Sequence, residues 1–268
     1  MSTTAPTIPA ALQEWRARRE ESLAAPHGVL AQVGLHWIPA DGAAHRPDGV
    51  PGAWRRTEEG LEVSWEREEL TLLTEDPEVV RVERTCGTTT VRVLAGGDVR
   101  LVSFGDDVQV DVIPRGDRIG LRVLDPAAPR RTGFDGVPVF PYDPEAVLRG
   151  TFTPRPAEVE VDSVLPWLTS TLPSPGTVVL DVAGEAVELV VTGRSTLILT
   201  DETSGAESAD WRQVEALIDG EDVEVDLNRA LNFPSAFSAW ATCPRPPAGN
   251  HLPLAVRAGE RRVEPTAR

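Results

Sequence analysis

The sequence predicts an all-β protein, mainly an antiparallel sandwich or a partly open barrel, with one N-terminal α-helix. Short runs rich in Val, Thr and Ile recur along the chain, and Gly, Asp and Pro interrupt them, which is typical of strands joined by tight turns. Only residues 11–25 combine apolar residues at helical spacing with Ala, Glu and Arg, and Pro26 follows them, so we expect a helix there.

The first half of the chain is predicted to consist of strands after this helix. Residues 29–38 predict a short strand or turn, and a loop follows it. Residues 61–113 predict a succession of strands, because runs such as EVVRVERT and TTTVRV are rich in β-branched residues. The strongest pattern spans 108–126, where apolar and polar residues alternate on both sides of a Pro-Arg-Gly-Asp turn. This pattern predicts a β-hairpin.

The second half begins with a change in composition. Proline is dense between 126 and 156, which disfavours a long helix and favours a segment that crosses between two sheets. Residues 183–184 (Ala-Gly) are expected to turn a tight hairpin, and residues 210–218 to form a short helix or part of a loop. The further strands expected here are 158–164, 177–182, 187–192, 195–200 and 223–227.

The 268 residues suffice for one large β domain or two small ones. We divide the chain into a helix and arm at 1–27, a β-rich half at 28–150 and a second β-rich half at 151–268. The second half ends in a loop rich in Pro and Asn. The two halves can also form one continuous domain.

The charge of the chain limits its partners. The 42 acidic and 26 basic residues give a net charge of −16, which repels phosphate backbones and anionic membrane surfaces. We therefore expect neither nucleic-acid nor membrane partners. Every basic residue is Arg, which excludes a Schiff-base Lys and a P-loop Lys. Without an apolar signal-peptide core, Cys86 and Cys243 are expected to be reduced thiols in the cytoplasm.

Motifs of common catalytic and cofactor sites are missing from the sequence, among them G-x-S-x-G, G-x-G-x-x-G, Walker A and H-E-x-x-H. We therefore expect no cofactor. His27, His36 and His45 recur every nine residues, which fits neither one face of a helix nor one face of a strand, so no metal site is predicted. Cys243 is expected to be a small buried residue, although His251 can fold back towards it.

Five stretches resemble, in the same order, one family of bacterial proteins, the domain of unknown function numbered 1684. They are GVLAQVGLHWIPADG (28–42), RGDRIGLRVLDP (115–126), FDGVPVFPYDP (134–144), TDETSG (200–205) and DLNRALNFPSAFSAWATCPRPPAGNHLPLAVRAGE (226–260). The resemblance implies little about activity, because sequence alone defines the family. It implies characteristic polar residues at Arg115, Asp117, Arg118, Arg122, Asp125, Thr203, Ser204, Asp226, Asn228, Arg229, Asn232, Cys243, Asn250 and Glu260.

Two departures from the family pattern bear on activity. Where the family usually has Asn-Pro-Pro-Cys-Ala-Phe, this chain has Ser235 in place of the cysteine, which argues against an obligatory thiolate. After Thr-Ser-Gly the family typically has a Tyr-Gly-rich stretch, whereas AESADWRQV (206–214) stands here. If that stretch shapes an active site, the activity is altered or lost in this chain.

The best-supported function is binding of a small polar or anionic ligand. Arg118 and Arg122 share one face of a strand, and two guanidinium groups can hold a carboxylate or phosphate. The candidate ligand residues are Arg115, Arg118, Arg122, Asn228, Asn232, Trp240 and Asn250. Each has a structural alternative, because Arg forms ion pairs with nearby Asp, and Asn pins irregular backbone through its amide. The oligomeric state stays open.

Two other classes of function remain open, and so does the question whether the protein is an enzyme. A metal-independent hydrolase would use Asp201, Ser204, Asp226 and Arg229, provided that these groups converge in one cleft. The TDETSG run can equally end a strand with a turn. A protein-interaction module would instead present a contiguous exposed apolar patch.

Overall fold

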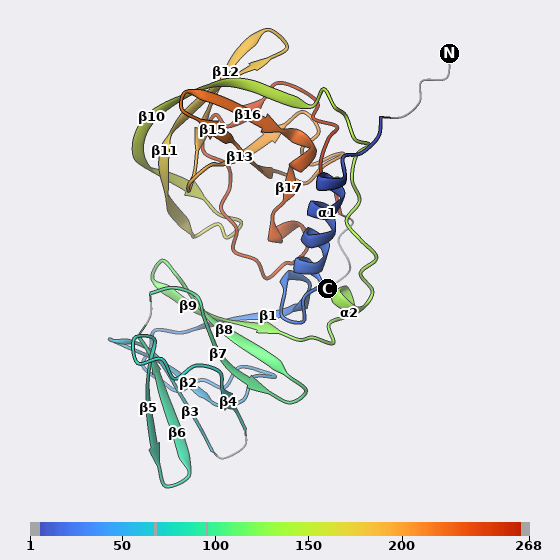
Figure 1. Ribbon diagram of the computed structural model, residues 1–268. Coiled ribbons are helices and arrows are strands. Elements are labelled where there is room, and N and C mark those ends of the chain that lie inside the picture. Colours follow the sequence, from blue (N-terminus) through green and yellow to red (C-terminus); the bar gives the residue numbers. More distant parts are fainter. Residues whose placement is uncertain (1–5, 67–68, 95, 264–268) are drawn as a thin grey trace. The chain divides into compact units, whose positions relative to one another are not determined.

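The computed structural model describes residues 6–66, 69–94 and 96–263 of the chain (Figure 1). The chain divides into two compact units. We call Ser22–Phe134 the inserted unit, and Met1–Glu21 together with Asp135–Arg268 the terminal unit. This division places the boundary at residues 134 and 135, where the sequence suggested one near 150. It also joins the N-terminal helix to the C-terminal half.

The inserted unit consists of antiparallel strands in two sheets. In its described residues, one sheet has the order β1-β9-β8-β7-β4 and the other β2-β3-β6-β5. The strands are β1 (Gln32–Ile38), β2 (Ala53–Thr57), β3 (Gly60–Glu66), β4 (Thr71–Leu72), β5 (Val80–Thr85), β6 (Thr88–Val93), β7 (Val99–Phe104), β8 (Val108–Arg115) and β9 (Arg118–Leu124). The short helices are η1 (Val29–Ala31) and α2 (Pro129–Thr132). Buried side chains of both sheets form one core, so the unit is a sandwich.

The terminal unit begins with α1 (Ala10–Leu23) and continues with two further sheets. Their strand orders, over the residues that the structure describes, are β12-β11-β10-β16-β15 and β17-β14-β13-β18. The strands are β10 (Val147–Asp162), β11 (Thr169–Val182), β12 (Glu185–Val191), β13 (Thr196–Asp201), β14 (Arg212–Glu215), β15 (Leu217–Asp219), β16 (Asp222–Asp226), β17 (Leu231–Asn232) and β18 (His251–Leu252). The 3-10 helices are η2 (Leu227–Arg229) and η3 (Pro234–Ala236). All pairs are antiparallel except β13 with β18.

The structure confirms the predicted fold class, which is all-β and mainly antiparallel with an N-terminal helix, and its sheets are not closed into a barrel. The 108–126 hairpin is confirmed, because β8 pairs with β9 from Gln109 to the turn. The Ala183-Gly184 turn is confirmed as well. Both of its residues have positive φ angles, 54° and 90°, as a two-residue hairpin turn requires.

Two local predictions were wrong. The proline-rich segment does not simply cross between sheets, because its second part is the long strand β10. In β10, Arg155 and Pro156 lie opposite the single residue Pro175, and such a bulge tolerates a residue without an N–H group. Residues 210–218 form β14 and β15, not a helix or loop.

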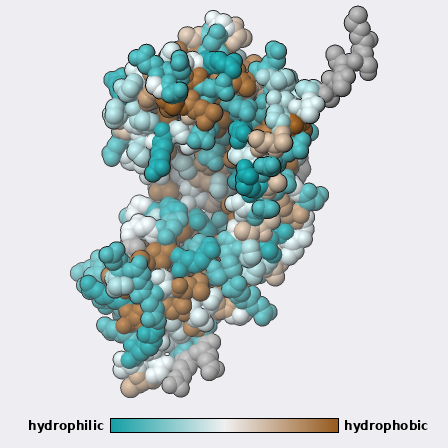
Figure 2. All heavy atoms as spheres, viewed as in Figure 1, coloured by the Kyte–Doolittle hydropathy of each residue, from teal (hydrophilic) through white to brown (hydrophobic). Residues whose placement is uncertain are grey.

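Polar residues dominate the face of each unit drawn in Figure 2, with smaller groups of hydrophobic residues between them. Among the described residues, the exposed large hydrophobic side chains are Val33, Leu73 and Leu217. Val33 lies on β1, and Leu73 follows β4, at opposite edges of one sheet. Leu217 belongs to the other unit, on the edge strand β15. Val33 and Leu73 therefore do not form one apolar patch within their sheet.

None of the helices in the described part of the chain is both long enough and apolar enough to cross a membrane.

Candidate functional site

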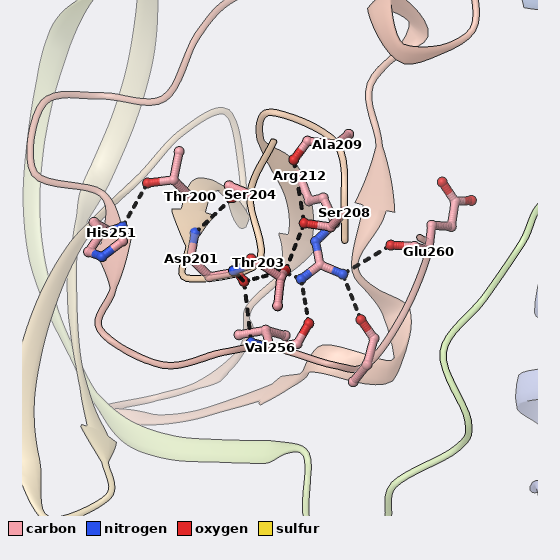
Figure 3. Close-up of polar contacts among 11 residues, drawn as sticks. Thr200, Asp201, Thr203, Ser204, Ser208, Ala209, Arg212, His251, Val256 and Glu260 are labelled. Atoms are coloured by element: carbon pink, nitrogen blue, oxygen red, sulfur yellow. Dashed lines mark hydrogen bonds and ion pairs between the residues drawn. The ribbon is translucent and has the colours of Figure 1, made fainter. Parts of the chain in front are cut away.

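Arg212 is the centre of a buried polar network in the terminal unit (Figure 3). It points inward from β14, as Val214 does, and its side chain is fully buried. Its Nη1 donates to the carbonyls of Ala258 (2.6 Å) and Glu260 (3.1 Å), and its Nη2 donates to the carbonyl of Val256 (2.9 Å). One arginine thereby binds three carbonyl groups of the irregular C-terminal segment to the sheet.

Asp201 supplies the counter-charge to Arg212. Its Oδ2 accepts from Arg212 Nη2 at 2.9 Å, and the side chains of both residues are 1% exposed or less. Its Oδ1 accepts from the Thr203 amide (2.8 Å), the Thr203 hydroxyl (2.6 Å) and the Val256 amide (3.2 Å). Both carboxylate oxygens are thus engaged by the protein, so this ion pair organises the segment.

A second buried carboxylate, Glu260, fastens α1 to the same segment. Its Oε1 accepts from Arg19 Nε at 3.1 Å, and its Oε2 accepts from the Asn232 amide at 2.7 Å. Arg19 Nη2 also donates to the Asn232 carbonyl at 2.8 Å. Burial raises the pKa of Glu260 above its ordinary value, while Arg19, the Asn232 N–H and Arg212 act to lower it.

Gly259 allows this close packing beside Glu260. Its φ angle is +76°, and a Cβ atom there would lie 2.5 Å from the Ala230 carbonyl oxygen. Only glycine fits both the backbone conformation and the space. The Gly-Glu pair at 259–260 therefore presents the Glu260 carboxylate to α1.

A small pocket lies between α1 and this polar segment, and we call it the α1 pocket. Four residues of one helix face line it, together with residues of the 137–139, 228–230 and 259–260 segments. The lining residues are Trp15, Arg16, Arg19, Glu20, Val137, Val139, Asn228, Ala230, Gly259 and Glu260. The centre of a water molecule has about 10 Å³ in which to move, which is room for one ordered water or one ligand oxygen.

Arg16 is the unusual member of the α1 pocket. Its Nε and Nη2 atoms are shielded from solvent and have no hydrogen-bond partner in the protein. Burial lowers the pKa of Arg16, whereas the carboxylates of Asp226, Glu260 and Glu20 raise it. Buried N–H donors almost always find an acceptor. The donors of Arg16 are therefore available to an acceptor that enters the pocket.

The asparagines predicted to bind a ligand mainly bind backbone. The side-chain amide of Asn228 bonds to both the N–H and the C=O of Asp143, and the side-chain amide of Asn250 does the same with Val190. Asn232 donates from Nδ2 to the Arg261 carbonyl at 2.8 Å. Its Oδ1 is buried without a partner. Trp240 is half-buried, and its backbone N–H donates to Ser238 Oγ. These contacts favour the scaffold interpretation of the loop.

The predicted arginines lie in the inserted unit, apart in the chain from the asparagines. Arg115 forms two hydrogen bonds with Asp98, at 2.5 Å and 2.9 Å, and Arg122 Nη1 lies 3.8 Å from the same carboxylate. Arg118 is exposed, opposite Arg115 across the hairpin turn. The contacts of Arg115 and Arg122 favour the structural alternative, with Asp98 as the shared partner.

The residues predicted for a hydrolase are divided between two sets of contacts. Ser204 Oγ accepts from the Asp201 amide at 3.0 Å, within the closed network of Arg212. Asp226 caps η2 because its carboxylate accepts from the backbone N–H of Asn228, and the same carboxylate lies 3.4 Å from Arg229 Nε. Arg229 in turn stacks on Trp15, with its guanidinium carbon 5.2 Å from the ring centroid. Neither set joins a nucleophile to a base.

Sequence reasoning missed Arg16, Arg19 and Arg212. Arg16 and Arg19 lie in the predicted helix 11–25 and received no role there, and Arg212 lies in the segment 206–214 that departs from the family pattern. The partners of these arginines are remote: Arg19 and Glu260 are separated by 241 positions. The alternation of β14 was a usable signal, but a charged residue normally indicates the outward face of a strand.

Comparison with known proteins gives a resemblance to one family and no activity. The family model described as "Protein of unknown function (DUF1684)" matches residues 132–261. No curated protein matches the chain. Among solved structures, the solution NMR structure of an uncharacterized protein from gene locus rrnAC0354 of Haloarcula marismortui has 28% sequence identity. That match covers 49% of this chain and 79% of the other, with a TM-score of 0.40.

The family match covers every strand of the terminal unit and the polar segment around Arg212, Asp201 and Glu260. Helix α1 precedes it, so the match includes only one wall of the α1 pocket. The stretches 28–42 and 115–126 also precede it. Over residues 132–261, this chain therefore resembles the family of unknown function DUF1684.

Proposed function

We propose that this protein binds a small molecule through a carboxylate group at the α1 pocket. The observation that carries the proposal is Arg16, whose Nε and Nη2 donors are buried without a partner at the pocket wall. A buried donor that stays unsatisfied costs about 1–3 kcal/mol, and more when the group is charged. A ligand oxygen that accepts from these donors recovers that free energy.

The charges around the pocket limit the charge that a ligand can carry. Two arginines and two glutamates line it. Arg19 is paired with Glu260, and Glu20 Oε1 accepts from the Val137 amide at 2.9 Å. Arg16 is thus the cation that no hydrogen bond engages, while the two carboxylates disfavour a doubly charged ligand such as phosphate. A monocarboxylate matches this balance.

The size of the pocket suggests how such a ligand would bind. The enclosed space accommodates one oxygen atom, so one carboxylate oxygen would enter and the rest of the molecule would lie at the mouth. Trp15 is half-buried there and stacks with Arg229, which offers an apolar surface for the remaining ligand atoms. Asn228 belongs to the wall, while Asn232 and Asn250 would hold the surrounding loop.

Thermal unfolding in the presence of small carboxylates tests the proposal. Acetate, pyruvate and benzoate, each at 10 to 50 mM, should raise the unfolding midpoint of the wild type relative to equal ionic strengths of sodium chloride, because a ligand of the native state stabilises by mass action. Arg16→Gln should remove the increase. Arg18→Gln is the matched control, since the Arg18 side chain lies on the same helix and is 66% exposed.

A second measurement separates a ligand site from a structural role. Without ligand, Arg16→Met should leave the free energy of unfolding within about 1 kcal/mol of the wild type or increase it, because it removes unsatisfied buried donors. If carboxylates raise the midpoints of Arg16→Gln and wild type equally, or if Arg16→Met unfolds the protein, the proposal is wrong.

A further inference from the structure

A hydroxyl, an imidazole and a carboxylate meet at the C-terminal end of β13. Successive residues of a strand point to opposite faces, so Thr200 and the residue two positions later, Glu202, lie on one side of the strand end. Asp201, between them, points inward to Arg212. In this Thr-Asp-Glu run the middle carboxylate is buried and structural, whereas the Thr200 hydroxyl is half-buried and the Glu202 carboxylate is exposed.

The parallel pairing of β13 with β18 brings His251 to this face. Thr200 and His251 are direct partners in the register. The pairing is held by the neighbouring Asn250, whose carbonyl accepts from the Thr200 amide at 3.0 Å. The buried Asn250 side chain also bonds to Val190 and to the carbonyl of Ile198. Asn250 therefore fixes the position of the imidazole relative to Thr200.

The three side chains form a continuous hydrogen-bonded chain. Thr200 Oγ1 lies 2.9 Å from His251 Nδ1, which Figure 3 shows, and His251 Nε2 lies 3.2 Å from Glu202 Oε1. An ionised carboxylate only accepts hydrogen bonds, so in the neutral ring Nε2 carries the proton. Nδ1 is then the lone-pair nitrogen and accepts from the Thr200 hydroxyl. Nucleophile, base and orienting acid are in the order that acyl transfer requires.

We infer that Thr200 is an acyl-accepting nucleophile that reacts with activated carboxylic esters. Thr200 Oγ1 attacks the ester carbonyl carbon while its proton passes to His251 Nδ1, and Glu202 holds the resulting imidazolium. The carbon–oxygen bond to the leaving group then breaks, and the leaving alcohol takes the proton from His251. Water, activated by the same imidazole, releases the acid and restores Thr200.

The exposure of the group defines its substrate class. The side chains of His251 and Glu202 are 45% and 59% exposed, so a small ester can approach without an opening movement. The main-chain N–H groups of Thr200 and Glu202 are already bonded, to the carbonyls of Asn250 and Leu254. These N–H groups are therefore not available to stabilise the oxyanion of the intermediate, and the ester must carry a good leaving group. The group uses none of the residues that line the α1 pocket.

The inference is tested with 4-nitrophenyl acetate and the full-length protein. We expect 4-nitrophenolate release above the buffer rate, and peptide mass spectrometry of the acid-quenched reaction should locate an acetyl group on Thr200. Thr200→Val, which is nearly isosteric, and His251→Gln should each lower the rate at least tenfold, and Thr200→Ser should retain it. Glu202→Gln should slow the reaction more than Glu202→Asp, because the aspartate keeps the carboxylate.

His45→Gln is the matched control for background imidazole reactivity. His45 also pairs with a carboxylate, that of Asp41 at 2.9 Å, and its side chain is 30% exposed. Its substitution should leave both the rate and the acetylated residue unchanged. Circular dichroism must show that Thr200→Val is folded. A folded Thr200→Val variant with the wild-type rate, or an acetyl group found only on other residues, would overturn the inference.

Discussion

At the scale of single residues, irregular backbone in the C-terminal segment is held by a few buried polar side chains. Asn228 and Asn250 each bond to both backbone groups of a remote residue. The sequence supported this interpretation, because Asn in a proline-rich run commonly replaces missing backbone partners. The sequence could not indicate Arg212, because three of its four hydrogen bonds are to carbonyls of residues 256–260, and any sequence supplies carbonyls.

Asp201→Asn tests the weight of the buried ion pair. The substitution keeps the volume and leaves the Arg212 guanidinium buried without a counter-charge, so we expect a loss of about 3–5 kcal/mol in the free energy of unfolding. Urea unfolding monitored by tryptophan fluorescence measures it. Glu224→Gln is the control, because its pair with Arg149 is exposed and should contribute under about 1 kcal/mol. Equal losses in both variants would contradict the assigned role of Asp201.

At the scale of elements, sequence patterns predicted the hairpins and turns whose stability depends on neighbouring residues. The hairpin of β8 and β9 and the turn at 183–184 follow from alternation and from turn residues within a few positions. β10 and β14 did not follow from their own residues. Pro156 is tolerated in β10 because it lies in a bulge of that strand. The inward Arg212 of β14 is tolerated because the C-terminal segment covers it.

The docking of α1 is another element-scale property, and Glu260 makes it depend on pH. Burial raises the pKa of Glu260, so the folded protein binds its proton more tightly than the unfolded chain does. Its contribution to stability is therefore greatest below the ordinary pKa of glutamate and decreases as the pH rises through the raised value. We expect the stability of the wild type relative to Glu260→Gln to fall in urea unfolding as the pH rises above the ordinary pKa of glutamate.

Glu207 provides a control of opposite sign for this pH dependence. Its hydrogen bonds with the exposed Arg257 lower the pKa of Glu207. The contribution of Glu207 is thus present above its ordinary pKa and is lost as the pH falls. The difference between wild type and Glu207→Gln should change with pH in the reverse direction. If both variants give the same slope, the direction assigned to Glu260 is wrong.

At the scale of the whole molecule, the sequence of one compact unit interrupts the sequence of the other. Composition did not reveal this division, since both units read as successions of strands. The joining of residues 1–21 to the C-terminal half depends on contacts such as Arg19 with Glu260, which no local pattern encodes. Each unit nevertheless has its own hydrophobic core, drawn from both of its sheets.

Two core substitutions test whether the units are energetically separate. Leu121 belongs to the core of the inserted unit and Leu189 to that of the terminal unit, and both are fully buried. Each Leu→Ala change should cost about 2–5 kcal/mol through lost burial and a new cavity. Hydrogen exchange followed by mass spectrometry should show faster exchange in β7, β8 and β9 for Leu121→Ala, and in β11 and β12 for Leu189→Ala.

Because the cores share no residue, each variant should leave exchange in the other unit unchanged. Faster exchange in both cores from either substitution alone would mean that the two units unfold as one cooperative block.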